Sequence, residues 1–286
     1  MEKIVVKFGG SSLASAEQIQ KAAAIIRRHT ESCYVVASAP GKRFPEDSKV
    51  TDLLYQAYDE AADGKDFSTT LAKIRTRFDD IVRELGIGLS LDADYAEIEN
   101  RLRTARERDF MASRGEYLNS KILAAYLGYP FVDPARAVVF RENGRLDAEK
   151  TDARLRDTLA GLTFAVIPGF YGARPDGTVQ TFSRGGSDVT GSLIAKAVRA
   201  KIYENWTDVS GMKSADPRIV PNPRTIRVIS FKELRELSYM GATVLHEDAV
   251  FPVREAGIPI NVRNTNAPDE PGTIIVAESP ADAADA

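Results

Sequence analysis

Cysteine, histidine and tryptophan are scarce in this chain of 286 residues, which contains one cysteine, two histidines and one tryptophan. Because Cys33 is the only cysteine, it cannot form an intramolecular disulfide, and this cysteine usage predicts a cytoplasmic location. His29 and His246 lie far apart in the sequence. We therefore expect neither a histidine-rich metal site nor a histidine that acts as a general base.

Long apolar runs and a strong excess of one charge are also missing. No run approaches the roughly 18 apolar residues that a membrane-spanning helix needs, and Glu2 and Lys3 interrupt the N-terminus too early for a signal peptide. The 38 basic and 41 acidic residues give a formal net charge of -3, which argues against duplex nucleic acid as the main partner. We expect no membrane or nucleic-acid partner, so any anionic ligand must be met by positive charge gathered locally.

Short apolar runs alternate with amphipathic stretches along much of the chain. Runs typical of buried strands cover residues 4–6, 34–37, 164–167, 201–203 and 258–262. Residues 16–28 have a helical pattern, which Ser15 and Gln18 precede with the spacing of a capping box. This strand–helix–strand order predicts an α/β fold with a mainly parallel sheet.

Residues 52–127 form a nearly all-helical block, which we interpret as a helical insertion. Helical patterns cover residues 52–62, 69–85, 94–106 and 114–127. Beyond the block, we expect a hairpin around 175–177, helices over 188–199 and 231–237, and a late helix that ends at Gly257. Residues 277–286 are small and polar, and we expect them to form a flexible tail.

The segment Lys7-Phe8-Gly9-Gly10-Ser11-Ser12 follows the first predicted strand and precedes the first predicted helix. Glycines at the end of a strand let backbone N–H groups approach an anion closely, and Lys7 adds a positive charge that suits a phosphate chain. The alternative is an ordinary Gly-Gly turn with an exposed lysine. The Walker A, Gly-x-Gly-x-x-Gly and Gly-x-Ser-x-Gly patterns are absent, which argues against P-loop, dinucleotide-dependent and α/β-hydrolase enzymes.

A second glycine motif, Ser183-Arg184-Gly185-Gly186-Ser187-Asp188, leads into a predicted helix whose N-terminus would favour a bound anion. Arg184 suits a carboxylate, because its guanidinium can donate two parallel hydrogen bonds. Alternatively, Ser187 or Asp188 simply caps the helix.

Two other polar segments are candidates for the site. Ser113 and Glu116 have the Ser-x-x-Glu spacing of a capping box, and this spacing alone favours a capping role over ligand binding for Glu116. The segment Trp206-Thr207-Asp208-Val209-Ser210-Gly211 follows a predicted strand, at the edge where open α/β sheets bind ligands.

These motifs belong to a series that runs along the whole chain: KFGGSS (7–12), SAPG (38–41) with VTD (50–52), SRGE (113–116), PGF (168–170), FSRGGSD (182–188), WTDVSG (206–211), ADPR (215–218) and LSYMGATVLHEDAV (237–250). In this order and combination they resemble the catalytic domain of the aspartate kinases, within the amino acid kinase family. The resemblance implies a three-layer α/β sandwich around a mainly parallel sheet, with residues 1–276 as one catalytic domain and no ACT regulatory domain. It also implies ATP-dependent phosphorylation of the L-aspartate side chain to 4-phospho-L-aspartate, the first step towards lysine, threonine and methionine, by a homodimer.

The same resemblance assigns roles to individual residues. Lys7, Gly9 and Gly10 would face the transferring phosphoryl group, Thr51, Glu116, Arg184 and Ser187 would hold aspartate, Asp188 would orient Lys7 or a magnesium-bound water, and Thr207, Asp208, Lys213 and Arg218 would line the ATP pocket. Arg184 suits the α-carboxylate of aspartate and Glu116 suits its α-ammonium group. Mg²⁺ is expected on the ATP phosphates, with no protein ligand assigned to it. A carboxylate nucleophile is already ionised at neutral pH, so this reaction needs no catalytic histidine.

The chain departs from the family pattern in two places. Thr243 stands where relatives often have a lysine near the nucleotide, and Lys213, often a tyrosine in relatives, would supply the missing charge. The loop over residues 40–50 is long and basic, and it is either a lid or a solvated surface loop. Two alternative functions stay open: another small-carboxylate kinase of the same fold, and a non-catalytic regulatory subunit that binds aspartate or a nucleotide.

Overall fold

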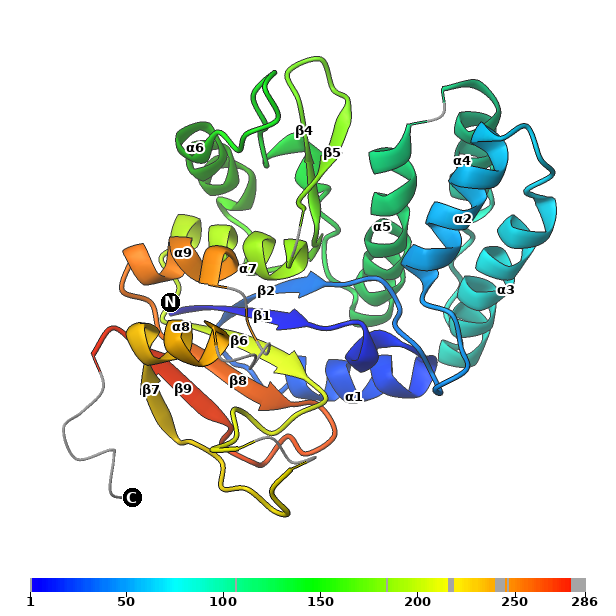
Figure 1. Cartoon of the computed structure of the whole chain (residues 1–286). Helices are drawn as coiled ribbons and strands as arrows, with labels where there is room; N and C mark the ends of the chain where they lie inside the picture. The colour runs from blue at the N-terminus through cyan, green and yellow to red at the C-terminus, as the bar shows by residue number, and fades with distance from the viewer. Residues whose placement is uncertain are drawn as a thin grey trace.

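The computed structural model describes residues 2–105, 107–183, 185–215, 219–239, 245 and 247–278. These residues form a seven-stranded sheet in the order β3-β2-β1-β6-β8-β9-β7 and a separate hairpin of β4 and β5 (Figure 1). The strands are β1 (Lys3–Phe8), β2 (Ser32–Ala37), β3 (Phe164–Pro168), β4 (Tyr171–Ala173), β5 (Val179–Thr181), β6 (Ile202–Thr207), β7 (Val228–Ser230), β8 (Ile260–Asn264) and β9 (Thr273–Val276). Neighbouring strands of the large sheet are parallel except for β8 and β9, which confirms the mainly parallel sheet expected from the sequence.

Helices cover both faces of this sheet. They are α1 (Ala16–Ile26), α2 (Val50–Ala62), α3 (Ser68–Leu85), α4 (Asp92–Thr104), α5 (Arg108–Leu127), α6 (Ala148–Leu159), α7 (Gly186–Val198), α8 (Phe231–Tyr239) and α9 (Glu247–Glu255), with short 3-10 helices η1 (Ser11–Leu13) and η2 (Pro134–Arg136). In the ranges given above, no helix combines the length and the apolar composition that a membrane span requires.

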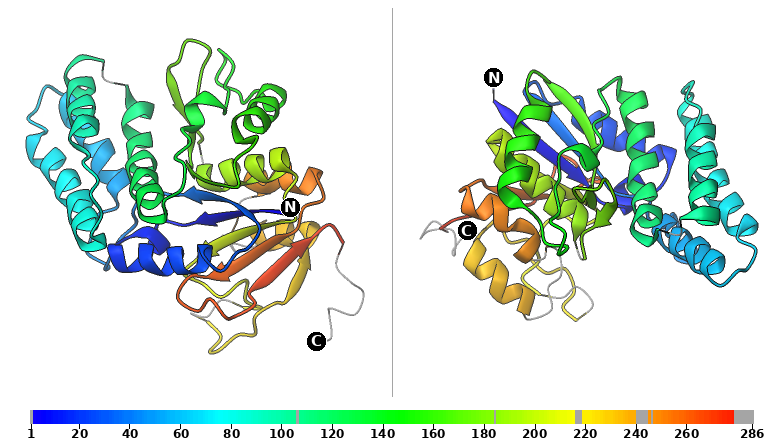
Figure 2. Two further views of the ribbon diagram at one scale, coloured as in Figure 1. Left: turned by 180° about the vertical axis from the view of Figure 1, so that it is seen from behind. Right: turned by 90° about the horizontal axis from the view of Figure 1, so that it is seen from above.

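The layers follow from the alternation of side chains along the strands. In β1, Val6 and Phe8 point into a core shared with α1 and α5, whereas Val5 points into a second core shared with α6, α7 and α9. The views in Figures 1 and 2 show these two groups of helices on opposite faces of the sheet. The fold is therefore a three-layer α/β sandwich, as expected.

The helical block enters the chain between β2 and β3, and it shares a core with the sheet. Helix α5 packs on β3, α2 packs on α5, and α3 packs on α2. Leu54, Phe78 and Ile98 of this block belong to the same apolar cluster as Val6 of the sheet. The block therefore acts as an extension of one face of the sandwich.

Some boundaries differ from those predicted. Helix α5 begins at Arg108 rather than 114, because the helix is buried on nearly all sides and its sequence shows no polar face to mark its start. Helix α6, capped by Asp147, and the three-residue strand β7 were not predicted at all: α6 is rich in charge, and β7 is too short to show a pattern. The predicted strand over 201–203 continues to Thr207, and the one over 258–262 starts only after Pro259.

Two local predictions fit the structure. Ser15 caps α1 by accepting a hydrogen bond from the Gln18 N–H at 3.3 Å. The capping box is not completed, because Gln18 Oε1, the atom that would accept from the Ser15 N–H, has no partner among the described residues. The hairpin of β4 and β5 turns at Gly177, whose φ of 87° favours glycine.

Candidate active site

The candidate site lies at the carboxyl ends of the parallel strands, where the winding of the chain changes direction. Helix α1 connects β1 to β2 on one face of the sheet, whereas α7 leads into β6 on the other face, and β1 and β6 are neighbours. Open α/β sheets bind their ligands in the crevice at such a reversal. The segments that leave the strands there are Gly9-Gly10 after β1, 38–49 after β2 and Asp208 after β6.

A hollow of about 480 Å³ opens between these segments. Its lining consists of Gly10, Ser11, Ser38, Ala39, Pro40, Gly41, Lys42, Lys49, Thr51, Glu116 and Asp208. The structure thus brings Gly10, Thr51, Glu116 and Asp208, all predicted site residues, to a single cavity.

Lys7 and Asp188 form an ion pair at the base of this region. Lys7, in β1, is 8% exposed, and its Nζ lies 2.7 Å from Asp188 Oδ1. Asn205, which faces Lys7 across the β1–β6 register, donates from Nδ2 to the same oxygen at 2.6 Å. The interpretation of Lys7 as an exposed lysine beside an ordinary turn is therefore wrong, because the ammonium group is buried and paired.

The backbone groups of Gly9 and Gly10 form hydrogen bonds with different parts of the molecule. The Gly9 N–H donates to the carbonyl of Trp206 at 2.9 Å, so it continues the contact between β1 and β6. Gly10 begins η1, and the carbonyl of Gly10 accepts a hydrogen bond from the Gly41 N–H at 2.8 Å. Gly10 thus joins the end of β1 to the loop that follows β2.

The second glycine motif starts α7 through its backbone alone. Gly185 is the N-cap residue with a φ of 56°, and Ser187 and Asp188 both lie inside the first turn. The interpretation of either side chain as the helix cap is therefore wrong. Ser187 packs against Gly169, where a Cβ atom would lie 2.5 Å from Ser187 Oγ. Arg184 lies outside the described residues.

Glu116 lies in the interior of α5, where the Ser113 hydroxyl donates to the carbonyl of Phe110. The predicted capping box is therefore wrong, because α5 starts earlier than the spacing suggested. Glu116 is 6% exposed, and its Oε2 has no hydrogen-bond partner among the described residues. Burial raises the pKa of Glu116 to about 8, although a backbone hydrogen bond with Ala39 favours the ionised form. A buried carboxylate with an unused oxygen at the edge of a cavity suits a ligand that brings a positive charge.

The predicted nucleotide residues divide between two places. Thr207 ends β6, and its hydroxyl donates to Asp208 Oδ1 at 3.1 Å, beside the first hollow. Lys213 lies in a second hollow of about 570 Å³, lined also by Ser210, Arg224, Thr225, Arg227, Glu270, Pro271 and Gly272. There the Lys213 ammonium donates to Thr225 Oγ1 at 2.7 Å. Arg218 and Thr243 lie outside the described residues.

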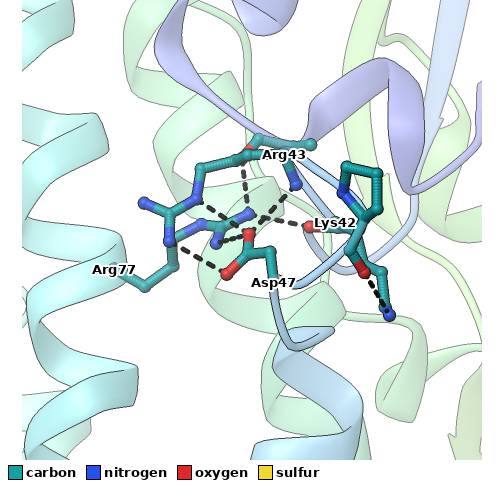
Figure 3. A network of polar contacts seen from close by, with 7 residues as sticks. Lys42, Arg43, Asp47 and Arg77 are labelled. Atoms are coloured by element: carbon teal, nitrogen blue, oxygen red, sulfur yellow. Dashed lines mark hydrogen bonds and ion pairs between the residues drawn. The ribbon is translucent and has the colours of Figure 1, made fainter.

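The sequence did not point to several residues of the site. Lys42 and Lys49 line the first hollow, and the basic composition of their loop was the one available signal. Asn205 contacts Asp188 without belonging to any motif used above. Arg77 of α3 binds the loop around Asp47 (Figure 3). Its position on the otherwise apolar face of a helix was the feature of the sequence that could have pointed to it.

The loop over 40–50 is neither free nor wholly solvated. Gly41 packs against Gly10, and the Ser38 carbonyl accepts a hydrogen bond from Asn119 Nδ2 of α5 at 2.8 Å. Residues 42–46 at the tip are exposed. The base of the loop is therefore part of the wall of the hollow.

Within the described ranges, no three His, Cys, Asp or Glu side chains gather in a way that could hold a metal ion. The acidic groups near the first hollow have separate surroundings: Asp188 is paired with Lys7, and Asp208 is exposed. This donor set fits a metal that arrives on a ligand better than one held in a protein cage.

Comparisons with known proteins agree with this geometry. Residues 2–264 match the model of the amino acid kinase family. The chain is 38% identical to aspartokinase 3 of Bacillus subtilis over 291 residues, which cover 96% of this chain and 63% of that protein. It therefore spans less than two thirds of the length of this relative.

Solved structures show the same similarity. The crystal structure of Clostridium acetobutylicum aspartate kinase matches with a TM-score of 0.92 and 47% identity, over 97% of this chain and 63% of that one. Escherichia coli aspartokinase III in complex with aspartate and ADP matches with a TM-score of 0.84 and 25% identity, over 98% and 66% of the two chains. On the match over residues 2–264 and the shared fold, this chain belongs to the amino acid kinase family.

Proposed function

We propose that this chain catalyses the aspartate kinase reaction, the transfer of the γ-phosphoryl group of ATP to the side-chain carboxylate of L-aspartate. The observation that carries the proposal is the buried carboxylate of Glu116, whose Oε2 has no partner among the described residues, in the same hollow as Gly10. The ammonium group of the Lys7–Asp188 pair lies beside the neighbouring Gly9, 3.9 Å from where a Cβ atom on that residue would be. An amino-acid substrate has an ammonium group that suits Glu116 and a carboxylate that suits cations. The relatives named above are aspartate kinases, and one of them was solved with aspartate and ADP.

Aspartate would bind with its α-ammonium group against Glu116. Because Glu116 is buried, its pairing with a cation is stronger than the same pairing would be in water. Thr51 lines the same hollow and would hold the substrate by its hydroxyl. We keep Arg184 as the proposed partner of the α-carboxylate, with Ser187 beside it.

In the transfer, an oxygen of the aspartate side-chain carboxylate forms a bond to the γ-phosphorus, and the bond from that phosphorus to the bridging oxygen of ADP breaks. The electron pair of the broken bond leaves with ADP, and no proton has to move. Lys7 would neutralise charge on the phosphoryl oxygens in flight, while Asp188 and Asn205 fix its position. The N–H of Gly9 is already bonded to Trp206, so the backbone donor role falls to Gly10, and Gly9 permits close approach.

Mg²⁺ fits this site as a partner of the ATP phosphates. Such a metal keeps most of its waters and uses one or two carboxylates. Among the described residues, Asp208, which lines the hollow, and the second oxygen of Asp188 are candidates for this role. When bound, Mg²⁺ would neutralise phosphate charge.

The second hollow would receive the rest of the nucleotide. Lys213, Arg224 and Arg227 give it positive charge, and Arg218 is proposed to contribute there. Lys213 is the proposed substitute for the lysine that relatives often have at the position of Thr243. A homodimer and one catalytic domain over 1–276 remain predictions from the resemblance, and the cytoplasmic location and the flexible tail over 277–286 remain predictions from the composition of the sequence.

A hydroxylamine trap tests the proposed reaction, because acyl phosphates convert hydroxylamine to hydroxamates. The chain would be incubated with ATP, Mg²⁺, hydroxylamine and one of aspartate, glutamate or N-acetylglutamate. We expect hydroxamate and ADP with aspartate alone. Product from N-acetylglutamate would favour another carboxylate kinase, and binding of aspartate without any product would favour a regulatory subunit.

A further inference from the structure

Arg77 is a buried arginine that belongs to no motif of the chain. It lies on α3, on the apolar face that also carries Ile74, Phe78 and Ile81, and it is 5% exposed. A buried guanidinium is costly unless its donors are paired, so its partners indicate what it is for. Both Nη atoms of Arg77 are paired, and its Nε has no partner among the described residues. Figure 3 shows Arg77 reaching from its helix into the loop that carries Lys42, Arg43 and Asp47.

The partners of Arg77 come from two segments that form the site. Its Nη2 donates to the carbonyl of Gly41 at 2.7 Å and to the carbonyl of Ala14 at 2.8 Å. Ala14 directly follows η1, the turn that Gly10 begins. One nitrogen atom therefore holds the segment after β1 and the loop after β2 at a fixed separation.

Those two segments touch each other beside the hollow. The Gly41 N–H donates to the Gly10 carbonyl, and a Cβ atom on Gly41 would lie 2.7 Å from the carbonyl carbon of Gly10. Gly10 and Gly41 both line the hollow. Arg77 thus holds Gly41 in contact with Gly10 from the side of α3. This contact determines how far apart the two segments lie where they line the hollow.

Asp47 is the third partner, and it does not depend on Arg77. Arg77 Nη1 donates to Asp47 Oδ2 at 2.6 Å. Arg43 also donates to Asp47, from its backbone N–H, Nε and Nη2, at 3.0, 2.8 and 3.0 Å. Loss of Arg77 would leave the 43–47 turn closed but would release the carbonyls of Ala14 and Gly41.

We propose that Arg77 is a positioning residue that fixes Gly10 against Gly41 and so sets the affinity of the site for the phosphate groups of the nucleotide. The inference rests on the proposed kinase function. Because Arg77 acts through backbone carbonyls, it touches neither substrate. Its loss should therefore weaken the binding of the nucleotide more than the binding of aspartate, because the proposed partner of aspartate, Glu116, lies on α5.

The test measures the KM of ATP, the KM of aspartate and kcat for Arg77→Met, Arg77→Lys and two controls. Since a misplacement of about 1 Å can cost up to about 100-fold, we expect Arg77→Met to raise the KM of ATP about tenfold or more, with a smaller change in the KM of aspartate. The KM of ATP for Arg77→Lys should lie between those of the unaltered chain and Arg77→Met, because an ammonium group cannot bridge both carbonyls and Asp47 with the geometry of a guanidinium.

Two control variants test whether the effect comes from the bonds of Arg77 to the two carbonyls or from its neighbours. Arg75→Met removes an exposed arginine of the same helix, paired with Asp79 and Asp92, and Arg43→Met removes the other partner of Asp47. Both should keep the KM of ATP within about twofold of the unaltered chain. An equal effect of Arg43→Met would overturn the proposal, because Arg77 would then act through Asp47.

Direct binding of ADP, measured by calorimetry without aspartate, keeps this test independent of turnover. If the unaltered chain binds ADP but does not phosphorylate aspartate, the proposed function fails while the Kd of ADP still tests Arg77. A folded Arg77→Lys or Arg77→Met chain with an unchanged Kd and KM would refute the positioning role. If Arg77→Met does not fold, Arg77→Lys decides the question by the same two constants.

Discussion

The hollow has two walls that are held in place by different kinds of bonds. The strand wall, Lys7–Gly10 and Asn205–Asp208, continues β1 and β6, whose backbones are joined by a parallel ladder. The loop wall, residues 38–49, has no strand or helix of its own before α2. Single backbone hydrogen bonds from Ser38 to Phe8 and from Gly41 to Gly10 join it to β1, and the side chains of Asn119 and Arg77 join it to the helical block. The strand wall is held by the continuous ladder of the sheet, whereas the loop wall is held by a few separate backbone bonds and by the two side chains that tie it to the helical block.

This difference indicates a division of labour between the walls. The strand wall carries Lys7, the charged group that would meet the phosphoryl group in flight, and Asp188 at the start of α7 pairs with it. The loop wall determines the width of the cavity and closes it with Lys42 and Lys49. Substitutions in the strand wall should therefore lower the rate of phosphoryl transfer, and substitutions in the loop wall should change the affinity for the nucleotide.

The largest effect is expected from Lys7→Met in the strand wall. Loss of one preorganised charge near a transferring group typically lowers the rate about 100- to 1,000-fold, and we expect kcat for aspartate-dependent ADP release to fall by that factor. The fold should survive, because Asp188 keeps its hydrogen bond from Asn205. Lys21→Met, which removes a partly exposed lysine that is paired with Glu17 on α1 and lies away from the hollow, is the control. Normal turnover by a folded Lys7→Met chain would contradict the assigned role of this wall.

Glu116, between the two walls, should make stability and substrate affinity depend on pH. Its pKa of about 8 in the fold exceeds the ordinary value of 4.5, so between these values the folded chain holds a proton that the unfolded chain has released. Stability should therefore fall as the pH rises from about 4.5 to about 8 and level off above. The total loss should be on the order of 5 kcal/mol, since each pH unit is worth about 1.4 kcal/mol. Urea unfolding across this range measures the slope.

Glu116→Gln should abolish that slope, whereas Glu97→Gln, an exposed position of α4, should keep it. In the unaltered chain the KM of aspartate should fall as the pH approaches 8, because the ionised carboxylate pairs with the ammonium group. The Gln variant should show a raised KM without this trend. A pH-independent KM in the unaltered chain would argue against Glu116 as the partner of the ammonium group.

The smallest effect is expected where the walls meet, at Gly10. A Cβ atom on Gly10 would lie 2.9 Å from the Ala39 carbonyl oxygen, whereas one on Gly9 would make only ordinary contacts, with the Trp206 carbonyl oxygen at 3.6 Å and Lys7 Nζ at 3.9 Å. The φ of Gly10 is -62°, which alanine adopts freely, so the conflict is steric. We expect Gly10→Ala to lower the free energy of unfolding by about 1–3 kcal/mol, and Gly9→Ala by less than about 0.5 kcal/mol. Thermal unfolding measures the stability of the two variants. Equal losses of stability in Gly9→Ala and Gly10→Ala would mean that the contact between the walls is not tight.

The strand wall was largely predictable from the sequence, and the loop wall was not. Apolar runs located β1 and β6, and the glycine and Trp-Thr-Asp motifs follow them at the edge where ligands bind. Arg77, by contrast, binds carbonyls 36 and 63 residues away in the sequence. No local pattern encodes such a contact, because it depends on how the helical block docks on the sheet.

Local spacing also misled where a helix was buried. Ser113 and Glu116 have the spacing of a capping box, but α5 continues through them because Phe110 and Met111 extend its buried face. Similarly, Ser187 and Asp188 resemble caps, yet the left-handed Gly185 starts α7 without a side chain. Spacing motifs describe the ends of exposed helices, and both of these helices lie against the core.

The reversed direction of β9 decides how the chain leaves the sheet. Ile275 of β9 pairs with Ile260 at the start of β8, and Thr273 pairs with Val262 further along it. Val276 therefore lies at the edge of the sheet opposite the first hollow, about one strand length, or roughly 15–20 Å, from it. A label, a surface linker or a fused protein attached after this strand would leave the entrance of the cavity clear. Immobilised through that end, the chain would present its open edge to the solution.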